Sequence, residues 1–233
     1  MSDGADVVHD SPPAEQRRSF DRLVNFTDAV VAIALTLQLL PLTEIPGPQD
    51  GETVWQVLAE NWGQIFAFLL SFIIVIVMWT VHNRLFNVLR TYDATILWLN
   101  IAWMLAIAFL PWPTAMYGNA NSSEVVGGGG VGLLYWANLA LISALGSMIA
   151  HHARRHPELL EPGALSRGWL AQTSRTRWRG LAFTTYLLMV GVASELLGSH
   201  TGWLALGLFP LGRFFSDRTA PAPEPHSAQA ASE

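Results

Sequence analysis

The chain has 233 residues, a formal net charge of −5, ten tryptophans and no cysteine. Half of its residues are hydrophobic and only 13% are charged, whereas about 25% is usual in soluble domains. The lack of cysteine excludes disulfides, thiolate chemistry and cysteine-based metal sites. The composition predicts an all-α integral membrane protein, because tryptophan favours the boundary between membrane and water. Neither a cofactor nor a nucleic-acid partner is expected.

Six segments are long and apolar enough to be predicted as transmembrane helices, since a bilayer core of about 30 Å requires roughly 20 residues. The sixth is short, and it spans only if it tilts little or lies in thin bilayer. We therefore predict a cytoplasmic N-terminal tail, a six-helix transmembrane domain and a disordered cytoplasmic C-terminal tail rich in Pro, Ala, Ser and Glu. The tails are residues 1–19 and 218–233, the domain is 20–217, and the spans are about 20–42, 62–86, 95–117, 130–152, 178–197 and 203–215.

The arginines are segregated along the chain, and the chain has no lysine. Every arginine lies before or near the start of the first predicted span, near or after the end of the sixth, or in and beside the loops after the second and fourth spans. The loops after the first and third spans and the end of the fifth contain acidic residues, and the loops after these three spans contain no arginine. Because basic residues in short loops stay on the cytoplasmic side, this pattern predicts both termini in the cytoplasm, with the lipid bilayer as a partner.

The first predicted helix carries a stripe of residues on one face. At about 100° per residue, Ile33, Thr36, Leu37 and Leu40 share this face, and Asp28 lies about 140° from Ile33. If the stripe faces a pore, Asp28 points into the surrounding helices. Ordinary helix packing also explains such a stripe, so the pattern alone leaves both interpretations open.

Ionisable side chains inside a span are costly and are functional candidates by default. Asp28 and His82 are predicted to lie at similar depths near the cytoplasmic boundary. A buried carboxylate requires partners, and the nearest candidates by depth are Arg22, Trp79, His82 and Asn83. The simple alternative is that His82 is a solvated ring at the membrane surface.

Several motifs in the first half of the chain resemble the transmembrane-protein-175 family, which comprises the endolysosomal potassium channels and their prokaryotic relatives. The first is Arg22-x-x-x-Phe26-Thr27-Asp28, with Thr27 where serine is usual. The others are Ala32-Ile33 followed by Thr36-Leu37, then Trp79-x-x-His82-x-x-x-Phe86, and Pro111-Trp112-Pro113-Thr114.

This resemblance implies a potassium-preferring leak-type cation channel in a prokaryotic plasma membrane, built as a homotetramer around a central pore lined by the first helix. It implies a constriction at Ile33, with Leu37 and Leu40 further outward, and a hydroxyl layer at Thr36. Potassium would then pass Ile33 and Thr36. The implied network at the inner mouth consists of Arg22, Phe26, Thr27, Asp28, Trp79, His82 and Asn83.

Two other classes of function are considered. A proton-linked secondary transporter would use Asp28 and His82 as a relay, but no inverted repeat or broken midplane helix supports it. A membrane-embedded enzyme would require a polar cluster open to substrate. Asp28 with His82 is too sparse to define a reaction, so no catalytic residue is predicted.

Overall fold

The computed structural model describes residues 14–122, 129–164 and 176–197, and in this part of the chain it is all-α, as predicted. The longer helices are α1 (Ala14–Leu37), α4 (Trp62–Phe86), α5 (Ala94–Phe109), α6 (Pro111–Ser122), α7 (Val131–Arg155) and α8 (Thr176–Leu197). The shorter ones are α2 (Leu40–Thr43), α3 (Val54–Glu60) and a 3-10 turn at Pro157–Leu159.

Four stretches are long and apolar enough to cross a membrane: Arg18–Thr43, Trp62–Phe86, Ala94–Ala120 and Val131–Arg155. They correspond to the first four predicted spans. α8 corresponds to the fifth, and its 22 residues measure about 33 Å at 1.5 Å each, although its apolar part, Gly180–Leu196, is shorter. The sixth predicted span, 203–215, and the predicted C-terminal tail lie outside the described residues.

Prolines break two of the predicted helices. The first is predicted over about 20–42 with its end at Pro41, but α1 already ends at Leu37 and α2 follows. Pro41 lacks an N–H, and its ring crowds the carbonyl four residues earlier, which belongs to Leu37. Likewise, Pro111 and Pro113 divide the third predicted span into α5 and α6. α1 also begins at Ala14 rather than at residue 20.

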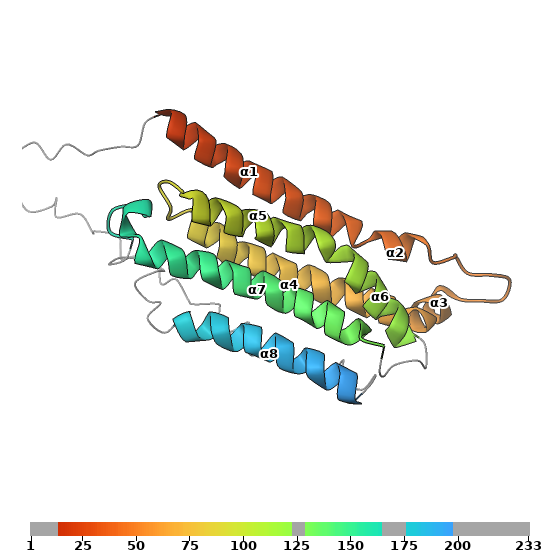
Figure 1. Ribbon diagram of the computed structural model, residues 1–233. Coiled ribbons are helices and arrows are strands. Elements are labelled where there is room, and N and C mark those ends of the chain that lie inside the picture. Colours follow the sequence, from red (N-terminus) through yellow and green to blue (C-terminus); the bar gives the residue numbers. More distant parts are fainter. Residues whose placement is uncertain (1–13, 123–128, 165–175, 198–233) are drawn as a thin grey trace, which may run out of the picture.

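The bundle has a central layer and two outer helices. α4, α5 and α7 lie side by side, with α1 packed mainly on α5 and α8 on α7, on opposite sides (Figure 1). Aromatic side chains fill the centre, and Trp103, Tyr135 and Trp136 are at most 1% exposed. Because α1 is an outer helix, it buries only one of its faces.

The two ends of the bundle differ in charge. α1 begins, α4 ends, α5 begins and α7 ends at the same end (Figure 1). We call it the basic end, because Arg18, Arg22, Arg84, Arg90, Arg154 and Arg155 lie there. At the acidic end, α2 and α3 lie near Glu44, Asp50, Glu52 and Glu60. This separation agrees with the pattern of the loops in the sequence.

Candidate functional site

The front face of α1 and α2 is the stripe expected from the helical periodicity, and it is exposed in the single chain. Ile33 is 59% exposed, Leu37 42% and Leu40 54%, and Thr36 is exposed as well. Leu40 lies in α2, beyond the break, so it is not held in register by the hydrogen bonds of α1. The structure therefore presents Ile33, Thr36 and Leu37 from one continuous helix and Leu40 from the next.

The hydroxyl group of Thr36 is oriented by its own helix. Thr36 Oγ1 donates its proton to the Ile33 carbonyl at 2.7 Å. A hydroxyl oxygen carries two acceptor lone pairs besides its proton. Because the proton is already committed to the backbone, the oxygen offers lone pairs on the exposed face, where they can accept a hydrogen bond or contact a cation.

The back face of α1 is buried against α4 and α5. Thr27, Val31, Ala34 and Gln38 are between 1% and 3% exposed, and their spacing of three or four residues defines one side of a helix. Gln38 stands at the break between α1 and α2, and neither of its side-chain amide atoms has a hydrogen-bond partner among the described residues. The back face thus carries one unsatisfied amide.

A buried chain of hydrogen bonds joins α1, α5 and α4. Thr27 Oγ1 donates to the Leu23 carbonyl at 2.9 Å and accepts from Asn100 Nδ2 at 2.8 Å. The Asn100 Oδ1 atom lies 2.9 Å from His82 Nε2. Since the amide oxygen can only accept, His82 Nε2 carries the proton. All three side chains are at most 5% exposed, and every hydrogen bond in the chain has a defined direction.

The His82 ring is fixed by stacking as well as by its hydrogen bond. Its centroid lies 4.1 Å from the ring of Trp103 and 4.2 Å from that of Phe86, both nearly parallel to it. A ring clamped between two aromatic faces cannot turn toward another partner without disrupting the packing. The His82 ring is therefore buried and held in place, and it is not a solvated ring at the membrane surface.

Asp28 has a separate partner. Trp79 Nε1 donates to Asp28 Oδ1 at 2.8 Å, which links α4 to α1. Of the other candidate partners, Arg22 is exposed and Asn83 is half-buried, and neither of them, nor His82, forms a described hydrogen bond with Asp28. Phe26, also expected in this network, is exposed. The expected single network is thus two separate connections, Asp28 with Trp79 and Thr27 with Asn100 and His82.

Asn100 was not among the predicted site residues, although it is the centre of the buried chain. Its signal in the sequence was an amide inside an apolar span, a position where a lone polar group is costly. A second missed cluster joins α4, α6 and α7. In it, Ser71 Oγ lies 3.1 Å from Thr114 Oγ1 and 2.8 Å from the Tyr135 hydroxyl.

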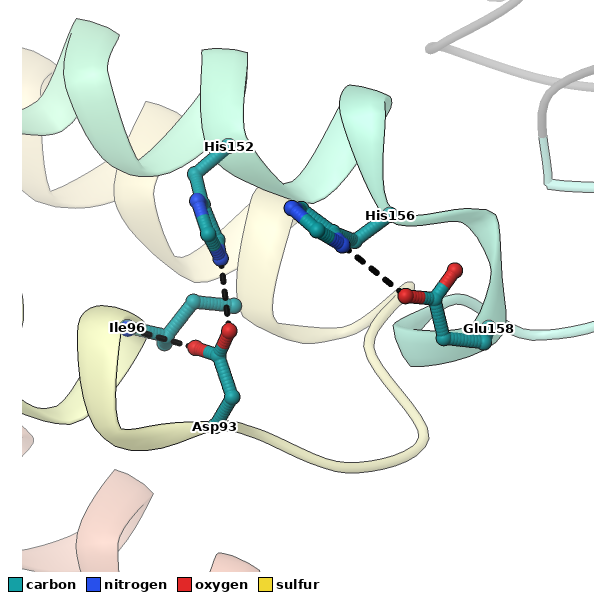
Figure 2. A network of polar contacts seen from close by, with 5 residues as sticks. All are labelled: Asp93, Ile96, His152, His156 and Glu158. Atoms are coloured by element: carbon teal, nitrogen blue, oxygen red, sulfur yellow. Dashed lines mark hydrogen bonds and ion pairs between the residues drawn. The ribbon is translucent and has the colours of Figure 1, made fainter.

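A further polar network lies at the basic end and connects α5 with α7 (Figure 2). Asp93 caps α5, since its Oδ1 accepts from the Ile96 amide at 2.8 Å, and its Oδ2 lies 2.6 Å from His152 Nε2. His156 Nδ1 lies 2.9 Å from Glu158 Oε1. Each imidazole thus faces a different carboxylate. Among the residues that the structure describes, no three metal-ligating side chains lie together.

The carboxylates of this network are stabilised in their charged form. Partial burial alone would raise the pKa of Asp93, but the Ile96 amide, the hydrogen bond with His152 and the charges of His152 and His156 together lower it. For Glu158, hydrogen bonds from its own backbone amide and from His156 lower the pKa. Both groups lie just outside the long apolar helices and contribute to holding the basic end together.

Comparisons with known proteins give a consistent similarity. Residues 22–111 match the family described as endosomal/lysosomal potassium channel TMEM175. The chain is similar to a potassium channel of Streptomyces collinus, with 33% identity over 95 residues, 41% of this chain and 46% of the relative. It is 34% identical over 105 residues to a potassium channel of Chamaesiphon minutus, covering 44% and 51% of the two chains.

A human relative is named an endosomal/lysosomal proton channel, TMEM175, and is 31% identical over 169 residues, 67% of this chain and 32% of the relative. The chain thus spans about half or less of the length of these curated relatives. A crystal structure of a lysosomal potassium-selective channel TMEM175 homologue from Chamaesiphon minutus superimposes with a TM-score of 0.64 at 22% identity, covering 85% of this chain and 96% of that one. This likeness establishes the fold.

Proposed function

We propose that this chain, whose residues 22–111 belong to the TMEM175 family, is one subunit of a potassium-preferring leak-type cation channel. The observation that carries the proposal is the contrast between the two faces of α1. One face is anchored by buried hydrogen bonds, whereas Ile33, Thr36 and Leu37 are exposed in the single chain. The relatives named potassium channels in two bacteria support potassium as the ion.

The subunit arrangement that fits this face is a homotetramer around a central axis. A closed ring of identical subunits places the same surface of each copy around that axis. Four α1 helices would then direct Ile33 and Leu37 inward and shield from lipid a stripe that one chain leaves uncovered. In this arrangement the ion path follows α1, and α2 continues it outward past Leu40.

The chemistry of such a path follows from its side chains. Four isoleucines converging on an axis restrict passage by excluding water, as hydrophobic constrictions do in other pores. The hydroxyl oxygens of four Thr36 residues, with their protons held by the Ile33 carbonyls, would replace part of the hydration shell of the ion. Potassium sheds water more readily than sodium, so a modest preference for potassium is expected.

The buried chain from Thr27 to His82 and the pair of Asp28 with Trp79 act as positioning contacts in this proposal. They hold the part of α1 nearest the basic end against α5 and α4, and so determine where Ile33 lies relative to the axis. Because the described arginines gather at this end, we place it in the cytoplasm of a prokaryotic cell, with the channel in the plasma membrane.

The test is potassium flux into liposomes that contain the purified protein. The wild type is compared with Ile33→Asn and with Ile73→Asn, a matched control on α4 whose side chain is 60% exposed. We expect passive potassium flux in the wild type. In Ile33→Asn, flux rises or the preference over sodium falls, because an amide wets the constriction. Flux in Ile73→Asn should equal that of the wild type.

If folded, tetrameric protein shows no potassium flux, the channel proposal is refuted. If Ile33→Asn and Ile73→Asn change the flux equally, the protein still forms a pore, but Ile33 does not form its narrowest point.

A proton pathway is the second candidate, because the human and other animal relatives are named proton channels. The same liposomes loaded with a pH-sensitive dye distinguish it from potassium conduction. Asp28 and His82 are engaged in separate hydrogen bonds, so a direct relay between them would require rearrangement. Saturable uptake driven by a pH gradient and abolished by Asp28→Asn would favour a proton-linked transporter over a channel.

A further inference from the structure

A groove of about 790 Å³ lies at the basic end, on the side of the bundle away from α1. It is lined by α4, α5, α7 and α8, and the buried side chains of His82 and Trp103 are part of the lining. The front face of α1 takes no part in it, so the channel proposal does not account for it. At 300–1,000 Å³, typical ligand sites are of similar size.

The mouth of the groove is cationic. Arg84, Arg154 and Arg155 line it together with His151, His152 and His156, and its described lining contains no carboxylate. The carboxylates of Asp93 and Glu158 do not line the groove and face its residues His152 and His156 (Figure 2). Arg84 and Arg155 are exposed and form no ion pair with a described carboxylate. Their positive charge is therefore available to an anion.

The body of the groove is apolar and opens toward the side of the bundle. Leu181 on α8 and Met148 on α7 line it and are 57% and 53% exposed. The hydroxyls of Ser143 and Thr184 also line it, but they lie 2.8 Å apart and bond to each other across the two helices. Deeper than the mouth, the wall thus offers mainly hydrocarbon contacts.

We infer that this groove binds an anionic phospholipid, with its phosphate between Arg84 and Arg155 and an acyl chain along α7 and α8. The argument is charge complementarity combined with an apolar slot whose walls belong to membrane-spanning helices. Basic pockets between transmembrane helices on the cytoplasmic side suit anionic headgroups, and arginine matches phosphate geometry well. The inference does not depend on ion conduction by the chain.

The test is native mass spectrometry of the detergent-purified protein titrated with phosphatidylglycerol, with phosphatidylcholine as the neutral lipid. The double variant Arg84→Gln/Arg155→Gln removes the phosphate contacts. Gly146→Leu fills the slot, where an added Cβ meets only Trp103 Nε1, at 3.7 Å. The matched control is Arg18→Gln/Arg22→Gln, which removes two exposed charges at the same end but outside the groove. All variants are first required to elute and melt like the wild type.

We expect the wild type and the control to bind phosphatidylglycerol equally, and both groove variants to bind it about tenfold more weakly. Phosphatidylcholine should bind all four proteins weakly. Equal binding by the wild type and the groove variants would overturn the site. An equal loss of phosphatidylglycerol binding in the control would show that the lipid is attracted by surface charge alone. If free glycerol phosphate competes for the site as strongly as the lipid does, the acyl chain does not contribute and the apolar slot is excluded. Because flux is not measured, failure here leaves the proposed channel untouched.

Discussion

The two faces of α1 differ in the size of their side chains and in how far the rest of the chain covers them. On the back face, Thr27, Val31 and Ala34 are at most 3% exposed, and Thr27 is joined to α5 by a hydrogen bond. On the front face, Ile33 and Leu37 are large, apolar and exposed. The back residues are small or polar and fit closely against a neighbour, whereas the front residues are bulky and largely uncovered by the described part of the chain. The back face thus holds α1 in the fold, and under the proposed function the front face serves assembly and the ion path.

Because of this contrast, we expect substitutions on the two faces to affect different properties. A change on the back face or in its hydrogen-bond partners alters the free energy of unfolding of the subunit. A change on the front face leaves the subunit intact and alters flux. Four changes, taken from the largest expected effect to the smallest, test how sharp this division is.

The largest effect is expected from Asn100→Leu. Asn100 is 0% exposed and bonds to both Thr27 and His82. Leucine therefore removes two hydrogen bonds and leaves the buried His82 Nε2–H without its acceptor, whereas the Thr27 hydroxyl keeps its bond to the Leu23 carbonyl. Interhelical hydrogen bonds in membranes are individually modest, but orphaned partners add to the cost. We expect a loss of about 2 kcal/mol in the free energy of unfolding, measured as a lower melting temperature in detergent.

Gln38→Leu is the control for this change, since it also replaces a buried amide by leucine. The Gln38 amide has no described partner, so its replacement should leave stability unchanged or raise it. Equal destabilisation by both variants would show that Gln38 has a partner in the assembled protein. A neutral Asn100→Leu would mean that the buried chain does not hold α1 in place.

The second effect compares Val31→Ala with Ile33→Ala on the same helix. Val31 is 3% exposed and Ile33 is 59% exposed. Truncating Val31 removes packing contacts and leaves a small void, at a cost of about 1 kcal/mol. Ile33→Ala should melt like the wild type and change potassium flux in liposomes severalfold, while Val31→Ala should conduct normally per folded protein. The reverse assignment would mean that the front face is packed and the back face is the path.

The sequence predicted the helices better than their interruptions. The second predicted span, 62–86, coincides with α4 because its long apolar run has polar residues at both ends. The sequence identified Pro41 and Pro111 as helix breakers, but it did not indicate how far each would interrupt its span. The strength of a proline break depends on whether neighbouring helices hold the chain straight, and single-chain periodicity does not contain this information.

Pairing between helices was the part that the sequence could not supply. Depth along the membrane suggested His82 as a partner for Asp28, yet the structure pairs His82 with Asn100 and Asp28 with Trp79. Depth is one coordinate, whereas a hydrogen bond also depends on the rotation of each helix. Predicting which residues share the stripe with Ile33 required only the periodicity of one helix, and for this reason the sequence could group them.

The third effect concerns Trp79→Phe, which removes the indole donor to Asp28 but keeps an aromatic ring. One hydrogen bond between membrane helices contributes about 0.6 kcal/mol on average, so a small fall in melting temperature is expected. Trp98→Phe is the control, because Trp98 is 68% exposed. A large loss of flux without a loss of stability would instead make Asp28 part of the ion path and weaken the division between the two faces.

The smallest effect is expected at the basic end, where the Asp93 carboxylate caps α5 and faces His152. The pKa of Asp93 is lowered in the folded protein, since the hydrogen bonds and nearby histidines outweigh partial burial. A lowered folded-state pKa contributes stability above the unfolded pKa, and this contribution disappears as the pH falls through the folded-state value. The wild type should therefore lose stability as the pH falls below about 4.

Asp93→Asn isolates this contribution, because asparagine can still cap α5 but cannot form an ion pair. At neutral pH the variant should be less stable by no more than about 0.5 kcal/mol, since the pair is partly exposed and screened. Its melting temperature should also fall less steeply than that of the wild type between about pH 6 and pH 3. Glu158→Gln, at the exposed partner of His156, should change the pH profile less. Parallel profiles for the wild type and Asp93→Asn would show that the cap, and not the charge, fixes this end of α5 while α1 remains held by its own buried bonds.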